Sequence, residues 1–337
     1  MKLIVDAMGG DHAPLEIVKG AVEGCRKYAV ELLLVGDQAA IEAALQDCPA
    51  CPKPQIVHAP KAISMEDDPL SILRENRDCS MAQGLKLLAG EGDAFLSAGS
   101  TGALVTGASS RVIFGKIRGI RRAAIASVLP LTNPVLLMDS GANIEVNAQE
   151  LVQFAQMGSL YMQKLHGVSK PRVALINNGA EATKGTALYQ EAHALLSQCP
   201  DIHFIGNAEG RDLPLGFCDV AVCDGFVGNV VLKLAEGFGK FMSQSLKEMF
   251  HHDPASMLGG LLTKKGIAAL KQRLDHKQYG GAPILGIPKP VIKAHGSSTA
   301  ASIVSAVRQA KYFYENEICQ SIAEFAARAK TGETTNG

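Results

Sequence analysis

Four short segments combine glycine with small polar residues, each after an apolar run and before a pattern of helical period. They span residues 97–102, 177–185, 224–229 and 293–298. Such a turn leaves backbone N–H groups unpaired at the start of a helix, where the helix dipole also favours an anion. A single turn of this kind is more often only a helix cap. Four together, two of them with Lys184 or Lys293, predict a phosphate-like ligand.

Several familiar alternatives do not fit these residues. No Gly-Lys-Ser/Thr ending of a P-loop is present. The first strand leads into residues 8–12, Met-Gly-Gly-Asp-His, which is not the glycine fingerprint of a dinucleotide site. Residues 99–102 have the wrong spacing for a nucleophile elbow, so a Ser-His-Asp acyl-enzyme is not supported.

Two further groups of residues have several possible roles. Asp6 and Asp11 follow the first strand and could bind a metal or hold the turn. We expect Asp11 to cap the helix that begins at Pro14. Cys48 and Cys51 form a C-x-x-C pair, but no second pair completes a zinc set, so we expect reduced cysteines in a surface loop.

The elements that must position these turns follow from apolar periodicity. Short apolar runs alternate with longer segments of helical period, which is typical of parallel strands joined by crossover helices. Strands are predicted at 3–7, 31–36, 54–59, 94–98, 124–129, 134–139, 172–177, 202–206 and 219–223. Helices are predicted at 14–28, 38–46, 69–90, 101–114, 147–166, 185–198, 229–250, 257–277 and 298–329.

The predicted fold class is α/β, with a mixed and mostly parallel sheet. The runs at 124–131 and 134–140 are joined by two residues only, so they must pair as an antiparallel hairpin. In an open sheet of this class the carboxyl ends of the strands gather along one edge, where ligands bind. We therefore expect the four turns to lie along one edge of the sheet.

Composition limits the organisation and the partners. The chain has 337 residues, with 33 basic and 33 acidic side chains, so it lacks the basic surface of a nucleic-acid binder. No apolar run is suited to targeting or to spanning a membrane, so a soluble cytoplasmic protein is expected. We predict a single α/β domain over 1–330, with a helical excursion at about 229–280 and a frayed tail at 331–337.

A series of motifs runs in order along nearly the whole chain. The motifs are Val-Asp-Ala-Met-Gly-Gly-Asp-His-Ala-Pro at 5–14, Ser-Ala-Gly-Ser-Thr-Gly-Ala-Leu at 97–104, Asp-Ser-Gly-Ala-Asn at 139–143, Ile-Gly-Asn-Ala-Glu-Gly-Arg-Asp at 205–212, Asp-Gly-Phe-Val-Gly-Asn-Val at 224–230, Tyr-Gly-Gly-Ala-Pro at 279–283 and Ile-Lys-Ala-His-Gly-Ser-Ser at 292–298. From Met1 to about Lys330 the chain closely resembles the PlsX family of phosphate acyltransferases. The set covers nearly the whole chain and is highly specific.

The resemblance implies a Rossmann-like three-layer α/β/α fold, related to phosphotransacetylases and isocitrate dehydrogenases, and a homodimer. It implies transfer of a fatty acyl group from acyl–acyl carrier protein to inorganic phosphate. The acyl phosphate would supply a membrane glycerol-phosphate acyltransferase in phospholipid synthesis, with the enzyme peripherally associated with the inner face of the membrane. Two alternatives remain open, an acyl-CoA phosphotransacetylase and a non-catalytic protein that binds carrier protein or membrane.

Roles for individual residues follow from this chemistry. Lys184 is expected to pair with phosphate or developing negative charge, and Asn229 to serve the oxyanion; the resemblance supports both positions. His295 is a candidate for protonating the thiolate, the alternative being a bond within its own turn. The expected substrate-binding residues are Ser100, Thr101, Gly102, Asp224, Gly225, Gly228, Gly296, Ser297 and Ser298. No metal or organic cofactor is required.

An apolar stretch at 256–262, followed by Lys264 and Lys265, indicates a membrane contact. A shallowly inserted helix tip would place Met257, Leu258, Leu261 and Leu262 among acyl chains and the lysines at anionic headgroups. A dimer contact or a buried helix would explain the same residues.

Overall fold

The computed structural model describes residues 1–48, 54–267 and 280–331. These residues form one sheet of eleven strands in the order β3-β2-β1-β4-β11-β10-β5-β6-β9-β7-β8. The strands are β1 (Lys2–Asp6), β2 (Glu31–Gly36), β3 (Gln55–His58), β4 (Ala94–Ser97), β5 (Ala124–Pro130), β6 (Pro134–Met138), β7 (Arg172–Ile176), β8 (His203–Ala208), β9 (Val220–Val222), β10 (Ala282–Leu285) and β11 (Val291–Lys293).

Helices cover both faces of this sheet. They are α1 (Leu15–Tyr28), α2 (Gln38–Gln46), α3 (Ser80–Gly90), α4 (Thr101–Ser109), α5 (Ala148–His166), α6 (Ala187–Ser197), α7 (Gly225–Phe250), α8 (Pro254–Leu262), α10 (Ala300–Glu315) and α11 (Ile318–Thr331). Two 3₁₀ segments, η1 (Pro69–Leu73) and η2 (Leu213–Leu215), complete the described elements.

The N-terminal half shows why the strands are almost entirely apolar. Leu3 and Val5 of β1 pack into a core with α1, α2 and α10, whereas Ile4 points to the opposite face, against α3 and α4. Successive strand residues face opposite sides of a sheet, so a strand covered on both faces needs apolar residues at every position. The second half repeats this arrangement, with α5, α6 and α11 on one face of β6, β7 and β9.

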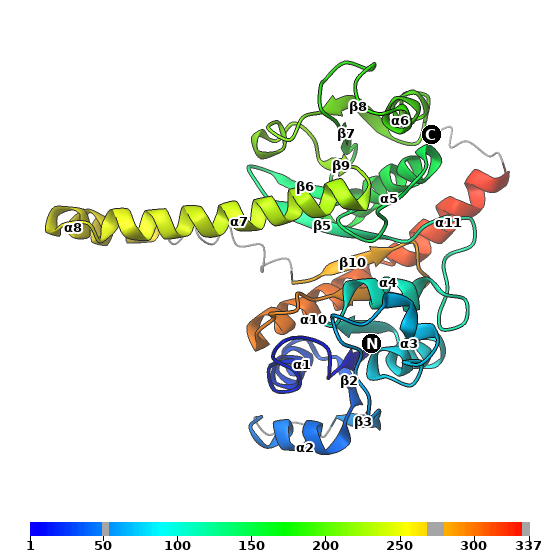
Figure 1. Cartoon of the computed structure of the whole chain (residues 1–337), viewed down its shortest axis with the longest axis vertical. Coiled ribbons are helices and arrows are strands. Elements are labelled where there is room, and N and C mark those ends of the chain that lie inside the picture. The colour runs from blue at the N-terminus through cyan, green and yellow to red at the C-terminus, as the bar shows by residue number, and fades with distance from the viewer. Residues whose placement is uncertain (49–53, 268–279, 332–337) are drawn as a thin grey trace.

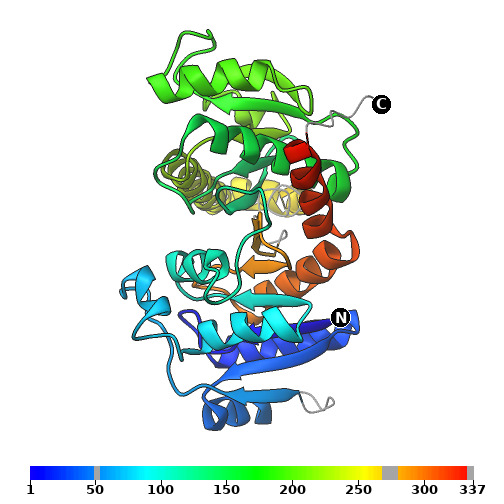
Figure 2. The ribbon, with the colours of Figure 1, turned by 90° about the vertical axis from the view of Figure 1, so that its right-hand side faces the viewer.

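The C-terminal helices connect the two halves. Helix α10 packs on the N-terminal core, and α11 packs on the core that α5 covers. Figure 2 shows this arrangement, with the N-terminal half in blue at one end, the half around β7 and β8 in green at the other, and α10 and α11 running past both. The predicted helix at 298–329 is thus two helices, because Glu317 adopts a left-handed conformation with φ of 51°.

Strand direction reverses between the halves. Strand β10 is antiparallel to both β11 and β5, and β5 is antiparallel to β6. The predicted hairpin of β5 and β6 is therefore confirmed. The expectation of a single edge for all carboxyl ends is wrong, because β6, β9 and β7 run opposite to β1, β4 and β11.

Helices α7 and α8 project from the body of the molecule (Figure 1). In α7 only Gly225 and Gly228 are buried, and α8 has no buried residue. The apolar residues of both helices are therefore exposed along much of their length. None of the helices in the described residues is long and apolar enough to span a membrane.

Candidate active site

The turns of the N-terminal half form one cluster around Asp6. The Asp6 carboxylate accepts hydrogen bonds from Ser80 Oγ and Ser97 Oγ, both at 2.7 Å, and from the amide of Met8 at 3.2 Å. Burial raises the pKa of Asp6, although these donors oppose the shift. Asp6 therefore holds the ends of β1 and β4 together, which is one of the two roles expected for it.

Close backbone approach in this cluster requires glycine at position 9. A Cβ there would lie 2.6 Å from both Asp6 Oδ2 and the amide nitrogen of Gly99. Ser100 caps α4, with its hydroxyl facing the amide of Ala103 at 3.5 Å. Asp11 does not cap α1, contrary to expectation: Pro14 is the N-cap and no side chain caps the helix. Asp11 instead faces the turn after β11, where its amide donates to Gly296 O at 2.8 Å.

The turn after β11 joins the same cluster. The Ala294 amide donates to Ser97 O at 2.9 Å, which fixes this turn beside the 97–102 turn. His295 Nδ1 lies 2.9 Å from Ser297 Oγ, so His295 does bond within its own turn. Ser298 is 3% exposed, and its hydroxyl has no partner among the described residues. Thr101 and Gly102 occupy the first turn of α4, where Gly102 lies against Pro69 of η1.

The turns of the second half form a separate cluster around Asp139. Its carboxylate accepts from the amides of Ile125, Gly141, Ala142 and Asn143 and from the Asn143 side chain, at 2.7 to 3.2 Å. Burial raises the pKa of Asp139 against these donors. The motif at 139–143 is therefore a rigid, internally bonded turn after β6.

The start of α7 is seated on that turn. Asp224, expected to bind substrate, caps the helix by accepting from the Val227 amide at 2.9 Å. The buried Tyr189 hydroxyl donates to the other oxygen of Asp224 at 2.6 Å. A Cβ at Gly228 would lie only 1.8 Å from Asp139 O, so only glycine allows this contact.

Asn229 lies at the surface, where the start of α7 contacts the 139–143 turn. A Cβ on Gly141 would be 3.6 Å from Asn229 Oδ1, so the amide borders the 139–143 turn, and Asn229 itself is exposed. Gly225 is held by its amide, which donates to Asn143 O at 2.7 Å. Tyr189 is a residue of this site that the sequence did not indicate, because one tyrosine in an amphipathic helix gives no signal.

Lys184 lies in the loop between β7 and α6. Helix α6 begins at Ala187, two residues later than predicted, so Lys184 precedes the helix. Its backbone is fixed on both sides: the amide donates to Glu181 O at 3.1 Å, and the carbonyl accepts from Asn177 Nδ2 at 3.2 Å. The side chain packs over Gly179 and is exposed.

Two lysines lie near the junction between the clusters of the two halves, and one of them contacts His295 across it. Lys233, on α7, places Nζ 3.5 Å from His295 Nε2. Lys293, at the end of β11, directs Nζ to Ala98 O at 3.4 Å and also donates to Ala294 O. Burial and the charge of Lys233 lower the pKa of Lys293 to about 8, against the attraction of Asp11 and Asp6.

The remaining predicted residues lie elsewhere. Met257, Leu258, Leu261 and Leu262 are 56, 59, 67 and 78% exposed, so the described chain does not bury them in a helical core. Cys48 is partly buried at the end of α2, while Cys51 lies outside the described residues. Among the described residues, no group of three or more His, Cys, Asp or Glu side chains is arranged to hold a metal ion.

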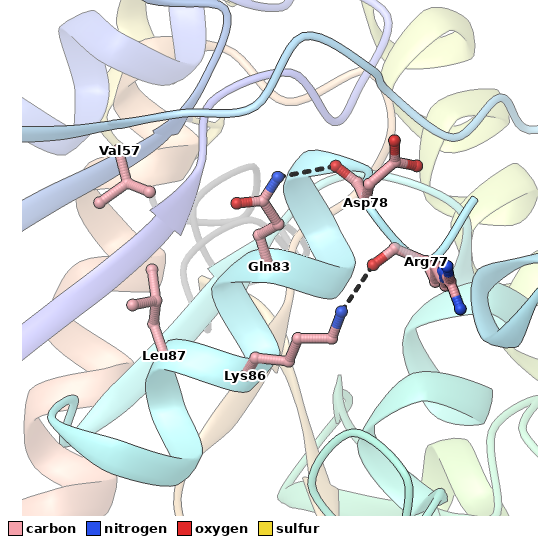
Figure 3. Close-up of a pocket in the computed structure, with 6 residues that line it drawn as sticks. All are labelled: Val57, Arg77, Asp78, Gln83, Lys86 and Leu87. Carbon is pink, nitrogen blue, oxygen red and sulfur yellow. Dashed lines mark hydrogen bonds between the residues drawn. The ribbon is translucent and has the colours of Figure 1, made fainter. Parts of the chain in front are cut away.

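A pocket of about 320 Å³ lies apart from these turns, between β3 and α3 (Figure 3). Its lining is Val57, Arg77, Asp78, Gln83, Lys86 and Leu87. The polar groups of this pocket are used locally: Gln83 Nε2 donates to Asp78 O, and Lys86 Nζ donates to Arg77 O. No residue predicted for phosphate or thioester chemistry lines it, so the two turn clusters remain the candidate site.

Comparison of the fold with solved structures finds phosphotransacetylases. A phosphotransacetylase from Streptococcus pyogenes superposes with a TM-score of 0.60 at 17% identity, covering 97% of this chain and 94% of that one. The EutD phosphotransacetylase from Staphylococcus aureus gives 0.58 at 16% identity, covering 93% and 94%. At this identity the similarity establishes the fold, a Rossmann-like three-layer α/β/α arrangement.

Sequence comparisons are more specific. The family model described as "Fatty acid synthesis protein" matches residues 1–321. A protein named phosphate acyltransferase from Thermoanaerobacter pseudethanolicus is 44% identical over 327 residues, which cover 96% of this chain and 97% of that protein. One of the same name from Heliobacterium modesticaldum is 44% identical over 328 residues, with the same coverage. The chain therefore belongs to the PlsX family of phosphate acyltransferases.

Proposed function

We propose that the protein transfers a fatty acyl group from acyl–acyl carrier protein to inorganic phosphate, giving acyl phosphate and the free carrier thiol. Membership of the phosphate acyltransferase family over nearly the whole chain supports this most directly. Two clusters of strand-end turns, which meet at Lys233 and His295, are consistent with two substrates held at one junction. Phosphotransacetylase activity on acyl-CoA is the second candidate, supported only by the shared fold.

The reaction needs little more than positioning and charge stabilisation. A phosphate oxygen attacks the thioester carbonyl carbon, the C–S bond breaks, and the electron pair leaves on sulfur as a thiolate. Phosphate is a competent nucleophile near neutral pH, so holding it beside the carbonyl supplies much of the rate. A thiol of ordinary pKa about 8.5 is also a good leaving group and needs only a proton from solvent or a nearby acid.

The two turn clusters suggest a division of these tasks. Asn229 is exposed on the rigid 139–143 seat, so its amide and the first N–H groups of α7 could serve the developing oxyanion. Lys184 is held by its backbone on both sides while its side chain is exposed, which suits contact with an anionic substrate. Gly296, Ser297 and Ser298, with Thr101 and Gly102, would surround the phosphate.

His295 is a weaker candidate for the acid that protonates the thiolate. Lys233 Nζ lies 3.5 Å from Nε2, and the Ser297 amide donates to Nδ1 at 3.2 Å. Both ring nitrogens of His295 therefore have neighbours at the junction, Lys233 on one side and its own turn on the other. We therefore assign His295 a positioning role.

The partners and the assembly follow from the family and from the exposed helices. We propose a homodimer of single-domain chains that acts in the cytoplasm, contacts the inner face of the membrane peripherally and supplies a membrane glycerol-phosphate acyltransferase. The apolar residues of α7 and α8 are exposed, which suits both a dimer contact and shallow membrane insertion.

The function is tested by offering acyl–acyl carrier protein and inorganic phosphate to the purified enzyme and trapping acyl phosphate with hydroxylamine. We expect phosphate-dependent hydroxamate together with stoichiometric release of the carrier thiol. Acyl-CoA in place of the carrier substrate is the matched arm. Equal or faster turnover with acyl-CoA would favour the phosphotransacetylase, and no thiol release from either donor would leave only a binding protein.

A further inference from the structure

We propose that Lys293 and Lys233 bind the attacking phosphate between them, one from each half of the molecule, and that His295 positions Lys233 for this contact. The inference rests on the proposed function for its substrate. It assigns the phosphate-binding charge to two lysines that approach from different elements, β11 and α7, and not to the turn amides alone.

The first observation is where the Lys293 ammonium lies. Nζ reaches the carbonyls of Ala98 and Ala294, so it sits between the turn after β4 and the turn after β11. Among the described residues no carboxylate forms an ion pair with it, and Asp11 and Asp6 act on it only by longer-range attraction. The near neighbours of this ammonium are neutral carbonyl oxygens and not a carboxylate, so its positive charge remains available to an anionic ligand.

The second observation is that another cation is placed close by. Lys233 comes from α7, and its charge acts on Lys293 strongly enough to be second only to burial in lowering the pKa of that lysine. Contact with His295 Nε2 at 3.5 Å and with Glu236 at 2.9 Å holds Lys233 at the junction. Although Lys233 is paired with Glu236, its charge still disfavours the charged form of Lys293 in the free enzyme.

A phosphate dianion would turn the unfavourable interaction between the two lysines into a favourable one. Placed between the two ammonium groups, it converts their repulsion into two attractions. The buried Ser298 hydroxyl, in the turn after β11, has no hydrogen-bond partner among the described residues and could donate to it. Binding must then raise the pKa of Lys293, since an anion favours the charged form. By linkage, affinity for phosphate must fall as pH rises above about 8, where the free enzyme loses the Lys293 proton.

The charged groups around Lys293 determine whether its titration alone accounts for the pH dependence of phosphate binding. The charges that act on Lys293 are those of Lys233 from α7, Asp6 at the end of β1 and Asp11 in the turn after β1, while His295 of its own turn contacts Lys233. Phosphate itself is almost entirely the dianion above pH 8. Loss of affinity between pH 8 and 9.5 therefore reports on the enzyme and not on the ligand.

The test is equilibrium binding of inorganic phosphate to the enzyme without acyl donor, by isothermal titration calorimetry from pH 7.5 to 9.5. We expect wild-type affinity to fall above pH 8 towards a tenfold loss per pH unit. Lys293→Met should weaken binding at least tenfold at pH 7.5. Lys293→Arg should bind well and show a nearly flat profile, because guanidinium does not titrate in this range.

Lys233→Met is the second variant, because Lys233 is exposed and its loss should leave the fold intact. We expect a threefold to tenfold rise in both the phosphate dissociation constant and the KM for phosphate, with kcat nearly unchanged. Lys240→Met, on the same helix seven residues further on, is the matched control and should bind phosphate like wild type.

Three results would each overturn the inference. They are wild-type phosphate affinity in both methionine variants, the same decline with pH in Lys293→Arg as in wild type, and absence of phosphate binding by the wild-type enzyme. Failure of the proposed function looks different, since phosphate would bind with this pattern while hydroxamate formation from acyl–acyl carrier protein is absent.

Discussion

At the scale of single residues, the two clusters separate groups that build the site from groups that can react. Asp6 and Asp139 are buried and use their oxygens on neighbouring backbone and hydroxyl donors, so they shape the turns. Lys184 and Asn229 are exposed and remain available to substrate. A buried carboxylate surrounded by donors stabilises one loop conformation and has no capacity left for a ligand.

Replacing Lys184 by methionine should reduce turnover about 10²- to 10³-fold while leaving the protein folded, because an exposed charge that stabilises the transition state is lost. The measurement is hydroxamate formation at saturating phosphate, with circular dichroism as the check on folding. Lys170→Met, an exposed lysine just before β7, is the control and should keep full activity. Near-normal turnover in Lys184→Met would remove Lys184 from the mechanism.

The depressed pKa of Lys293 also affects stability. The pKa of Lys293 is about 8 in the folded protein and 10.5 in an unfolded chain. Between these pH values the unfolded chain binds the Lys293 proton more tightly than the folded protein does, so this lysine makes the free energy of unfolding rise with pH. Below pH 8 the lysine is charged in both states, and the full cost of holding it in the folded site is present.

Lys293→Met should therefore raise the free energy of unfolding at pH 7, by on the order of 2 kcal/mol after allowance for partial exposure. Urea denaturation at pH 7 and pH 10 measures this, and the gain should shrink at pH 10. Lys240→Met should change neither value. A methionine variant that is less stable than wild type at pH 7 would contradict the assigned cost.

At the scale of elements, α7 and α8 have an unusual exposed apolar surface. Phe226, Leu234, Phe238 and Phe241 on α7 are all more than half exposed, as are the four apolar residues of α8. The 3.6-residue repeat of a helix places several of these residues on one face. A partner surface, either a second copy or a lipid headgroup layer, would remove that area from water.

The double variant Leu258→Glu, Leu261→Glu should lose flotation with liposomes that contain anionic lipid. Two carboxylates at the helix tip oppose both apolar insertion and the attraction of Lys264 and Lys265 to the headgroups. Turnover in solution should persist, because α8 lies at the far end of α7 from the turns (Figure 1).

The matched control replaces Leu234 and Phe238, in the middle of α7, by glutamate. This variant should retain flotation if only the tip inserts, and it should become monomeric in size-exclusion chromatography with light scattering if α7 forms the dimer contact. Unchanged flotation of the α8 variant would exclude insertion of the tip.

At the scale of the whole molecule, β10 determines how the two halves meet. It stands between β11 and β5 in the sheet and is antiparallel to both, so strand direction reverses across it. Ile284 of β10 is fully buried and pairs with Ile125 of β5. The sheet is continuous only because this short strand bridges the halves.

Ile284→Ala should lower the free energy of unfolding by about 2–5 kcal/mol, the usual cost of a cavity at a fully buried aliphatic position. Urea denaturation measures the loss, and hydrogen exchange should show it in the strands on both sides of β10. Leu258→Ala, at an exposed position, should change stability by no more than about 0.5 kcal/mol. A loss confined to one half would mean that β10 does not couple them.

Most of the local structure follows from the sequence alone. Runs such as 3–5 and 173–176 are apolar at every position because both faces of their strands are covered, and this pattern is visible without a fold. The two-residue connection at 132–133 required an antiparallel hairpin. The turns around Lys184, Asn229 and His295 indicated phosphate chemistry, and the motifs at 224–230 and 292–298 were among those that indicated the family.

Which turns come together depends on the tertiary fold. Strands β10 and β11 have four and three residues in a stretch rich in glycine and proline, too short for a periodic signal, and they reverse the sheet. Their presence divides the turns into two clusters and brings Lys233 of α7 to His295, 62 residues away in sequence. Local sequence patterns predict helices, strands and turns, because these depend on residues close together in the chain. Contacts between distant segments depend instead on the order and direction of the strands.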